Sequence, residues 1–133
     1  MLSRSTSAGT AKSYQVEKSE GEWLNQLGPQ RHRVMRHEGT ERPHSSEFDS
    51  MYPEEGYFKC IACGYPLYTA SSKFRSTCGW PCFDQVIFSD DGCHVGTKPV
   101  MPPNMYEIVC NSCGSHLGHV FYGEKCTPKN ERH

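Results

Sequence analysis

The sequence has no long hydrophobic run. None of its windows approaches the ~20 consecutive apolar residues that span a bilayer, so we expect no transmembrane segment in these 133 residues. It also lacks an excess of charge of either sign, because 14 Lys and Arg residues are balanced by 15 Asp and Glu residues. That balance provides no general attraction to nucleic acid or to an anionic membrane. The length is typical of one compact domain, and we expect a monomer.

The first residues lack the apolar segment of a secretory signal peptide, so we expect a protein that is not secreted. Residues 1–15 are rich in hydroxyl side chains, and their basic residues Arg4 and Lys12 occur without any acidic residue. This composition resembles the edge of an organellar transit peptide, although a disordered tail of a cytosolic protein is the simpler interpretation. The compartment therefore stays open between the cytoplasm and a plastid or mitochondrion.

Two short helices are predicted before the main part of the chain. Ser19 and Glu22 fit a capping box, in which each side chain bonds the backbone N–H of the other residue. The first helix stops at Gly28-Pro29, and the second begins at Pro29 and ends at Gly39. Both are too short to be stable alone, so we expect them to pack on the domain that follows. Their inward-facing apolar residues are predicted to be Trp23, Leu24, Leu27, Val34 and Met35.

From Phe48 onward, aromatic and β-branched residues form short runs separated by Gly, Pro, Asn and Asp, which is typical of short antiparallel strands. The prolines from Pro99 to Pro103, with Asn104, predict an irregular loop. We therefore predict a mainly β fold over residues 16–133: a small domain of two antiparallel sheets with short N-terminal helices. The predicted strands are Tyr57–Cys60, Pro66–Thr69, Val86–Phe88, Tyr106–Cys110 and His119–Phe121.

Eight cysteines are the most informative feature, since such a count indicates a disulfide framework, a metal site or thiol redox chemistry. Four of them form two Cys-x-x-Cys-Gly segments, with Cys60 and Cys63 in one and Cys110 and Cys113 in the other. The two-residue spacer lets both thiolates reach one ion about 2.3 Å away. Four thiolates make a closed structural site, for which Zn²⁺ is favoured over iron. Two redox pairs or disulfides are the alternative.

The other four cysteines are Cys78, Cys82, Cys93 and Cys126. Cys78 and Cys82 flank Gly79-Trp80-Pro81, where the proline restricts the backbone. Trp80 is either a core residue or an indole that holds an apolar group of a substrate. His116 and His119 are three residues apart, so on a regular strand they face opposite sides. Only a turn at Gly118 would bring both rings to one site.

Together these segments resemble methionine sulfoxide reductase B, the zinc-containing reductases of methionine-R-sulfoxide. The resemblance extends from about Ser19 to His133, and residues 127–133 are similar to the approach to the family's nucleophile. The matching motifs are Gly39-Thr40-Glu41, Cys60-x-x-Cys63, Cys78-Gly79-Trp80-Pro81-x-Phe83, Cys110-x-x-Cys113 and His116-Leu117-Gly118-His119-Val120-Phe121.

This resemblance implies a mechanism and a role for each matching residue. A thiolate or selenolate of low pKa attacks the sulfoxide sulfur, and a second cysteine resolves the sulfenic acid that forms. Thioredoxin or a similar dithiol then reduces the disulfide. The resemblance implies that Trp80 contacts the substrate methyl group and that Cys78 is the resolving thiol. It also implies that His116 and His119 bind the sulfoxide oxygen and a water, and that Arg132 lowers the pKa of the nucleophile. Glu124 is a candidate neighbour of this site.

The family's nucleophile is the residue that would follow His133, where the sequence stops. Several explanations are open. The chain is truncated, or a selenocysteine codon was read as a stop. Alternatively, it is an inactive zinc-binding variant that serves as a protein-interaction module, or Cys126 or Cys82 replaces the nucleophile. The sequence assigns no role to Cys93.

Overall fold

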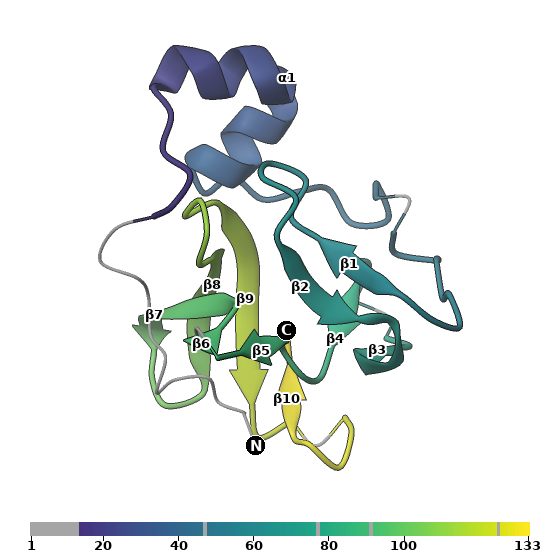
Figure 1. Ribbon diagram of the computed structural model, residues 1–133. Coiled ribbons are helices and arrows are strands. Elements are labelled where there is room, and N and C mark those ends of the chain that lie inside the picture. Colours follow the sequence, from purple (N-terminus) through teal and green to yellow (C-terminus); the bar gives the residue numbers. More distant parts are fainter. Residues whose placement is uncertain (1–13, 47, 77, 91, 125) are drawn as a thin grey trace.

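The computed structural model describes residues 14–46, 48–76, 78–90, 92–124 and 126–133 (Figure 1). The greater part of the predicted tail lies outside these residues. Among the described residues, no helix is both long and apolar enough to cross a membrane. In chain order the elements are α1 Glu20–Arg36, β1 Tyr57–Lys59, β2 Pro66–Thr69, the 3₁₀ helix η1 Ala70–Ser72, β3 Lys73–Phe74, β4 Cys82–Phe83, β5 Phe88–Ser89, β6 Gly92–Cys93, β7 Val95–Met101, β8 Met105–Cys110, β9 His116–Tyr122 and β10 Glu131–Arg132.

The predicted helices form one kinked helix, α1. Its capping box is present, with the Ser19 hydroxyl accepting from the Glu22 N–H and the Glu22 carboxylate accepting from the Ser19 N–H. Gly28 has a φ of 80° and joins the two halves at an angle, and Pro29 begins the second half. The helix ends at Arg36, before the expected Gly39, because the Gly39 N–H bonds back to the Arg33 carbonyl and closes the last turn.

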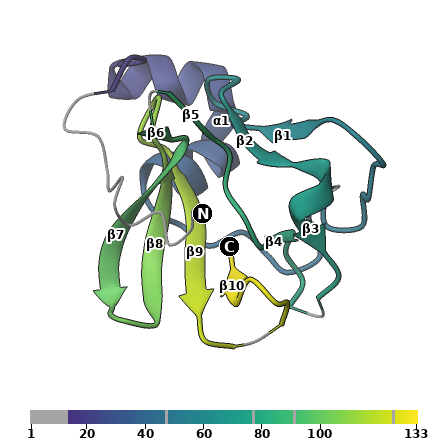
Figure 2. The ribbon, with the colours of Figure 1, turned by 60° about the horizontal axis from the view of Figure 1, so that its bottom comes forward.

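The mainly β, antiparallel fold class is confirmed. The largest sheet has four strands in the order β10-β9-β8-β7, and three two-stranded sheets pair β1 with β2, β3 with β4, and β5 with β6 (Figure 2). The described strands thus form four sheets, where two were expected. Phe83 and His133 exchange two backbone hydrogen bonds, of 3.2 and 2.8 Å, beyond the end of β10. This exchange connects the β3–β4 pair to the edge of the large sheet.

Two strand predictions need correction. Pro99 lies inside β7 instead of in a loop, and only Pro102 to Asn104 form the turn to β8. Proline is tolerated there because β7 is the outer strand of its sheet. The predicted strand at Val86–Phe88 begins only at Phe88, and the Ile87 N–H before it bonds the Leu67 carbonyl at 3.0 Å.

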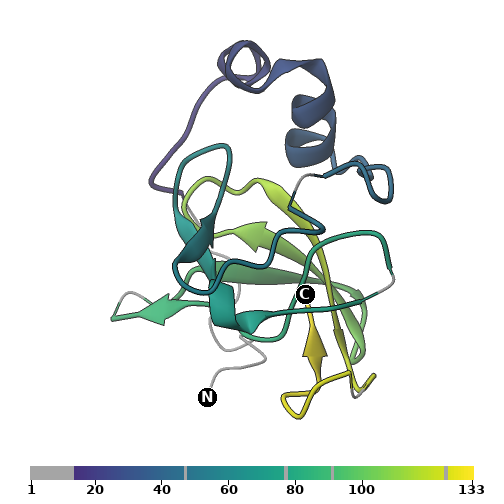
Figure 3. The same ribbon diagram turned by 90° about the vertical axis from the view of Figure 1, so that its right-hand side faces the viewer.

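The core lies where the large sheet, the β1–β2 hairpin and α1 meet. Helix α1 contributes Trp23, Leu27 and Met35, while Leu24 is exposed. Figures 1 and 3 show α1 lying across the ends of the β1–β2 and β8–β9 hairpins. Two contacts fix it there: Gln26 Nε2 donates to the Ala62 carbonyl at 2.6 Å, and Arg36 donates to the Cys113 carbonyl at 2.7 Å. The helix thus bridges both Cys-x-x-Cys segments.

Candidate functional site

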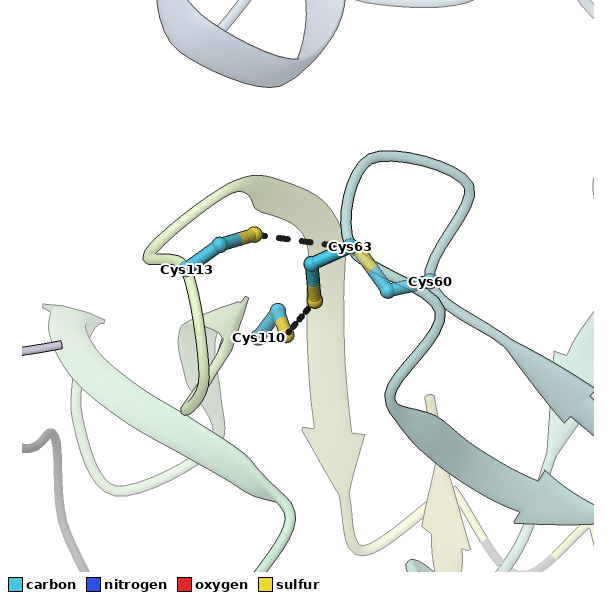
Figure 4. Close-up of side chains that lie close together, drawn as sticks. All are labelled: Cys60, Cys63, Cys110 and Cys113. Carbon is cyan, nitrogen blue, oxygen red and sulfur yellow. Dashed lines mark hydrogen bonds between the residues drawn. The ribbon is translucent and has the colours of Figure 1, made fainter. Parts of the chain in front are cut away.

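The four cysteines of the Cys-x-x-Cys segments converge between the two hairpins (Figure 4). Their sulfur atoms all lie within 4.8 Å of one another. Cys60 Sγ is 3.8 Å from Cys113 Sγ, and Cys63 Sγ is 3.6 Å from Cys110 Sγ. A tetrahedral ion with metal–sulfur bonds of about 2.3 Å has sulfur–sulfur edges of about 3.8 Å. The two measured edges match this arrangement.

The local backbone explains why these sulfur atoms meet. In both segments a glycine follows the second cysteine, and Gly64 and Gly114 have positive φ angles of 81° and 77°. Each glycine N–H bonds the carbonyl of the first cysteine, at 2.7 Å to Cys60 and 2.8 Å to Cys110. The chain therefore turns back within five residues and directs both thiols of a segment to the same side.

Hydrogen bonds within the cluster shift the thiol pKa values in opposite directions. Hydrogen bonds to Cys113 and Cys60 raise the pKa of the Cys110 thiol, with a further contribution from burial. Hydrogen bonds to Cys110 and Cys60 lower the pKa of the Cys113 thiol to about 2. Four thiolates at this distance repel one another unless a cation lies between them. The cluster can therefore hold a metal ion with four sulfur ligands. These would complete a tetrahedral coordination, so no position on the ion would be open for catalysis.

Cys78 and Cys82 form a second sulfur pair, separate from this cluster. Their sulfur atoms are 3.1 Å apart, and both lie 3.3 Å from the Trp80 carbonyl oxygen. Burial alone would raise the pKa of the Cys78 thiol, but interactions with Ser76, Cys82 and the Trp80 backbone, together with the charge of Arg132, lower it below its usual value. Burial and the neighbouring Cys78 raise the pKa of Cys82 to about 11.

The loop after α1 holds this segment in place. The Trp80 indole N–H donates to the Glu41 carbonyl at 2.8 Å, and the His44 N–H donates to the Gly79 carbonyl at 2.6 Å. Gly79 has a φ of 92°, and a Cβ added there would lie 2.8 Å from Pro43. The Gly39-Thr40-Glu41 and Gly79-Trp80 motifs are therefore in direct contact, and the indole has a fixed orientation.

His116 and His119 do lie on one face of β9, and a β-bulge is the cause. Ile108 of β8 pairs with Gly118, but the next residue, Val109, pairs with His116. Leu117 is thus an extra residue on β9, which shifts the alternation of side chains by one. The two imidazole rings are 5.7 Å apart, centroid to centroid. In place of the expected turn, Gly118 lies next to this bulge and has a φ of 148°.

Two carboxylates lie beside this histidine pair. Buried Glu107 accepts a hydrogen bond of 2.8 Å from His116 Nδ1, which leaves Nε2 as the second functional atom of the ring. Glu38 also belongs to this group, with ligand atoms of Glu38, Glu107 and His116 all within 4.8 Å. Burial and the nearby His116 lower the pKa of His119, so its ring is neutral at neutral pH.

The rings of His116, His119 and Phe121 form a row along β9, and Arg132 of β10 lies at its end. Its guanidinium lies 4.3 Å from the centroid of Phe121, whose ring is 6.3 Å from that of His119. Glu124 binds the guanidinium with both oxygens, at 2.6 Å to Nε and 3.2 Å to Nη2. The Glu124 hydrogen bond raises the pKa of Arg132, and Cys82 is also in contact with this guanidinium. Arg132 therefore connects the histidine row to the cysteine pair.

A shallow hollow of about 480 Å³ lies at the end of β9. Phe121 and Glu124, both of which contact Arg132, line it together with Met101 and Met105. Trp80, in contrast, does not line this hollow. This hollow therefore meets the row on its Phe121 side.

The structure brings the predicted residues into two groups joined by Arg132: Cys78 with Trp80, and His116 with His119. The sequence did not indicate three members of these groups, Glu38, Glu107 and Phe121, and Glu124 was a candidate only. Phe121 belongs to the motif that begins at His116, and Glu124 follows it closely, so the sequence could have indicated both. It could not have indicated Glu107, because only the β8–β9 register places this residue beside His116.

Comparisons with known proteins match this arrangement. The family model described as the SelR domain matches residues 27–133. The peptide methionine sulfoxide reductase B5 of Arabidopsis thaliana is 42% identical over 119 residues, which cover 89% of this chain and 82% of the relative. The chain belongs to the methionine sulfoxide reductase B family.

Other members of the methionine sulfoxide reductase B family share most of the chain. A bacterial relative, the peptide methionine sulfoxide reductase MsrB of Chromohalobacter salexigens, is 42% identical over 111 residues, or 82% of this chain and 80% of its own length. The peptide methionine sulfoxide reductase B3, chloroplastic, of Oryza sativa is 44% identical over 119 residues; these cover 89% of this chain but half of the rice protein. The matched region includes both cysteine groups and the β9 histidines.

Proposed function

We propose that this chain catalyses the thiol-dependent reduction of methionine-R-sulfoxide, free or within proteins, to methionine. Family membership supports the reaction class, since the relatives are named peptide methionine sulfoxide reductases. The observation that carries the proposal is the β9 bulge, which places His116 and His119 on one face in a row that leads to Arg132. This arrangement offers hydrogen-bond groups and a positive charge to one small polar substrate group.

The proposed first step removes the sulfoxide oxygen. A thiolate attacks the sulfoxide sulfur and the oxygen takes up a proton. The bond between the oxygen and the substrate sulfur then breaks, the hydroxyl is transferred to the attacking sulfur as a sulfenic acid, and methionine is released. His116 is suited to bind the oxygen, because Glu107 orients its ring, and His119 holds a water beside it. Trp80 packs against the substrate methyl group. The positive charge of Arg132 lowers the pKa of the nearby Cys78 and is suited to do the same for the attacking thiol. The family assigns that thiol to the position after His133.

The second part of the proposed cycle removes the sulfenic acid. Cys78 attacks the oxidised sulfur, a disulfide forms, and water leaves. Thioredoxin or a similar dithiol then reduces the disulfide by exchange. The half-buried position of Cys78 and its lowered pKa support this role, because a larger thiolate fraction is available at neutral pH.

We further propose that the four-cysteine cluster holds one structural Zn²⁺. The sulfur-to-sulfur distances fit its tetrahedral coordination, and bound zinc would hold the β1–β2 and β8–β9 hairpins together. No catalytic step involves this ion. The protein acts as a monomer without nucleic acid or membrane, in the cytoplasm or in an organelle; the chloroplastic rice relative supports the second location.

The test is a steady-state assay of the zinc-loaded chain with the separate R and S sulfoxides of methionine. Dithiothreitol serves as reductant first, and thioredoxin with its reductase and NADPH second. The same assay is run on the chain extended by the family's Cys-x-Asn-Ser segment and closing strand. We expect reduction of the R sulfoxide only, with the extended protein active. Cys93→Ser is the matched control and keeps full activity.

Three outcomes would change the proposal. Reduction of the S sulfoxide by either protein would contradict the assigned stereochemistry. Turnover by the chain as it stands, abolished by Cys126→Ser or Cys82→Ser, would place the nucleophile at one of these thiols. If neither protein turns over while both bind zinc and unfold cooperatively, the chain is an inactive zinc-binding interaction module.

A further inference from the structure

Cys78 and Cys82 lie close enough to bond to each other. Their sulfur atoms are 3.1 Å apart, and a disulfide needs about 2.05 Å. The two sulfur atoms therefore need to approach by about 1 Å to form the bond. The family resemblance assigns a role to Cys78 alone, so Cys82 is the unassigned partner.

The backbone between them favours this meeting. Gly79 adopts a φ of 92°, and Cys82 pairs with Phe74 at the start of β4, so the segment reverses direction between its two cysteines. The Trp80 carbonyl accepts from both thiols at 3.3 Å. One acceptor therefore holds both sulfur atoms on the same side of the loop.

The two thiols differ in access. Cys78 is half-buried, whereas Cys82 is 3% exposed. An external reagent therefore reaches Cys78 first. Arg132 contacts Cys82, and its charge stabilises a thiolate there when the bond to Cys78 is broken.

We propose that Cys78 and Cys82 form a second redox couple, an intrachain disulfide that closes and opens reversibly. In closing, the Cys78 thiolate attacks a disulfide R–S–S–R, forms a mixed disulfide and releases one thiolate. The Cys82 thiol gives its proton to that released thiolate and attacks Cys78 Sγ, which forms the intrachain bond and releases the second thiolate. Two electrons pass from the cysteine pair to the external disulfide. A dithiol reductant reverses both steps, attacking Cys78 and releasing Cys82.

The couple has a place in the reaction cycle, and this part rests on the proposed function. Phe83 and His133 exchange backbone hydrogen bonds in the antiparallel manner. The position that follows His133 along this ladder therefore faces Cys82. A disulfide between that position and Cys78 would lie beside the Cys82 thiol, which can displace the nucleophile and leave the Cys78–Cys82 disulfide for the reductant.

The test follows the fate of Cys78 in the zinc-loaded chain treated with excess oxidised glutathione. Samples are quenched in acid, digested and mapped by mass spectrometry. We expect Cys78 and Cys82 joined in one peptide that has lost two hydrogens. In Cys82→Ser, glutathione should stay on Cys78. In Cys78→Ser, glutathione should modify Cys82 more slowly than it modifies Cys78 in Cys82→Ser, by on the order of tenfold or more, because access and thiolate fraction control the rate of thiol exchange.

Cys93→Ser is the matched control and should give the same Cys78–Cys82 disulfide as the unaltered chain. The proposal is overturned if the unaltered chain accumulates glutathione on Cys78 and no intrachain disulfide. It is also overturned if Cys82→Ser and the unaltered chain give the same products.

The extended protein separates this inference from the proposed function. With thioredoxin as reductant, Cys82→Ser should slow steady-state turnover more than it slows the first turnover. If the protein reduces the sulfoxide and Cys82→Ser slows the first turnover and steady-state turnover equally, Cys82 has no role in the cycle, and the reductase function still stands. A mapped disulfide without any sulfoxide reduction would remove the function and leave the redox couple.

Discussion

Removal of the metal from the four-cysteine cluster is expected to unfold the domain. The change is either a chelator in excess or Cys60→Ser, which removes one of the four sulfur atoms that lie within 4.8 Å of one another. A structural zinc site contributes about 10–16 kcal/mol at pH 7. A whole domain is stable by only about 5–15 kcal/mol. The contribution of the ion is therefore comparable to the whole free energy of unfolding.

Other contacts between the hairpins cannot compensate. Helix α1 bridges the two cysteine segments through Gln26 and Arg36, with hydrogen bonds to Ala62 and Cys113. Such bonds contribute about 0.5–3 kcal/mol each, the upper values applying to charged donors. Both acceptors belong to the segments that the ion holds, so we expect the helix to detach as the cluster opens.

The assay combines near-ultraviolet circular dichroism with urea unfolding at buffered free zinc. The metal-free chain should lose the near-ultraviolet signal and the cooperative transition, and zinc should restore both. Cys93→Ser serves as the control and should bind zinc normally and change stability by about 1 kcal/mol or less. If the metal-free chain unfolds cooperatively at the same urea concentration as the zinc-loaded chain, the assigned contribution of the cluster is wrong.

Three further predictions concern the remaining site. Gly79→Ala should destabilise the chain by about 1–3 kcal/mol in urea unfolding, since its Cβ would lie 2.8 Å from Pro43 at a φ of 92°; an unchanged midpoint would contradict this. Arg132→Met should raise the pKa of Cys78, so alkylation of that thiol at pH 7 should be slower, and equal pH profiles would exclude an effect of the charge. Burial lowers the pKa of His119 in the folded chain, so the unfolded chain binds a proton there more readily. The stability that the neutral ring provides is therefore present above pH 6.5 and is lost as the pH falls. His119→Asn should therefore lose less stability than the unaltered chain between pH 7 and pH 5.5, as measured by urea midpoints.

Local patterns determined the parts of this protein that depend on neighbouring residues. The capping box at Ser19, the break at Gly28-Pro29 and the Cys-x-x-Cys-Gly segments each act over a few residues, so their structures follow from the sequence. The short strands at Tyr57–Lys59 and Pro66–Thr69 were predictable for the same reason. Strand β7 was not, because its Lys98 and Pro99 break the apolar alternation and its pairing with β8 decides the structure.

The candidate site shows the same division. The sequence, through its family resemblance, named Cys78, Trp80, His116, His119 and Arg132, and its Cys-x-x-Cys segments indicated the four cysteines that can hold a metal ion. Only the tertiary structure decided that the histidines face one side, since the bulge at Leu117 depends on the register between β8 and β9. Only the tertiary structure placed Glu107 beside His116 and Cys82 beside Cys78 and Arg132. Side-chain identity is local, but which side chains meet depends on strand register and on contacts between distant segments.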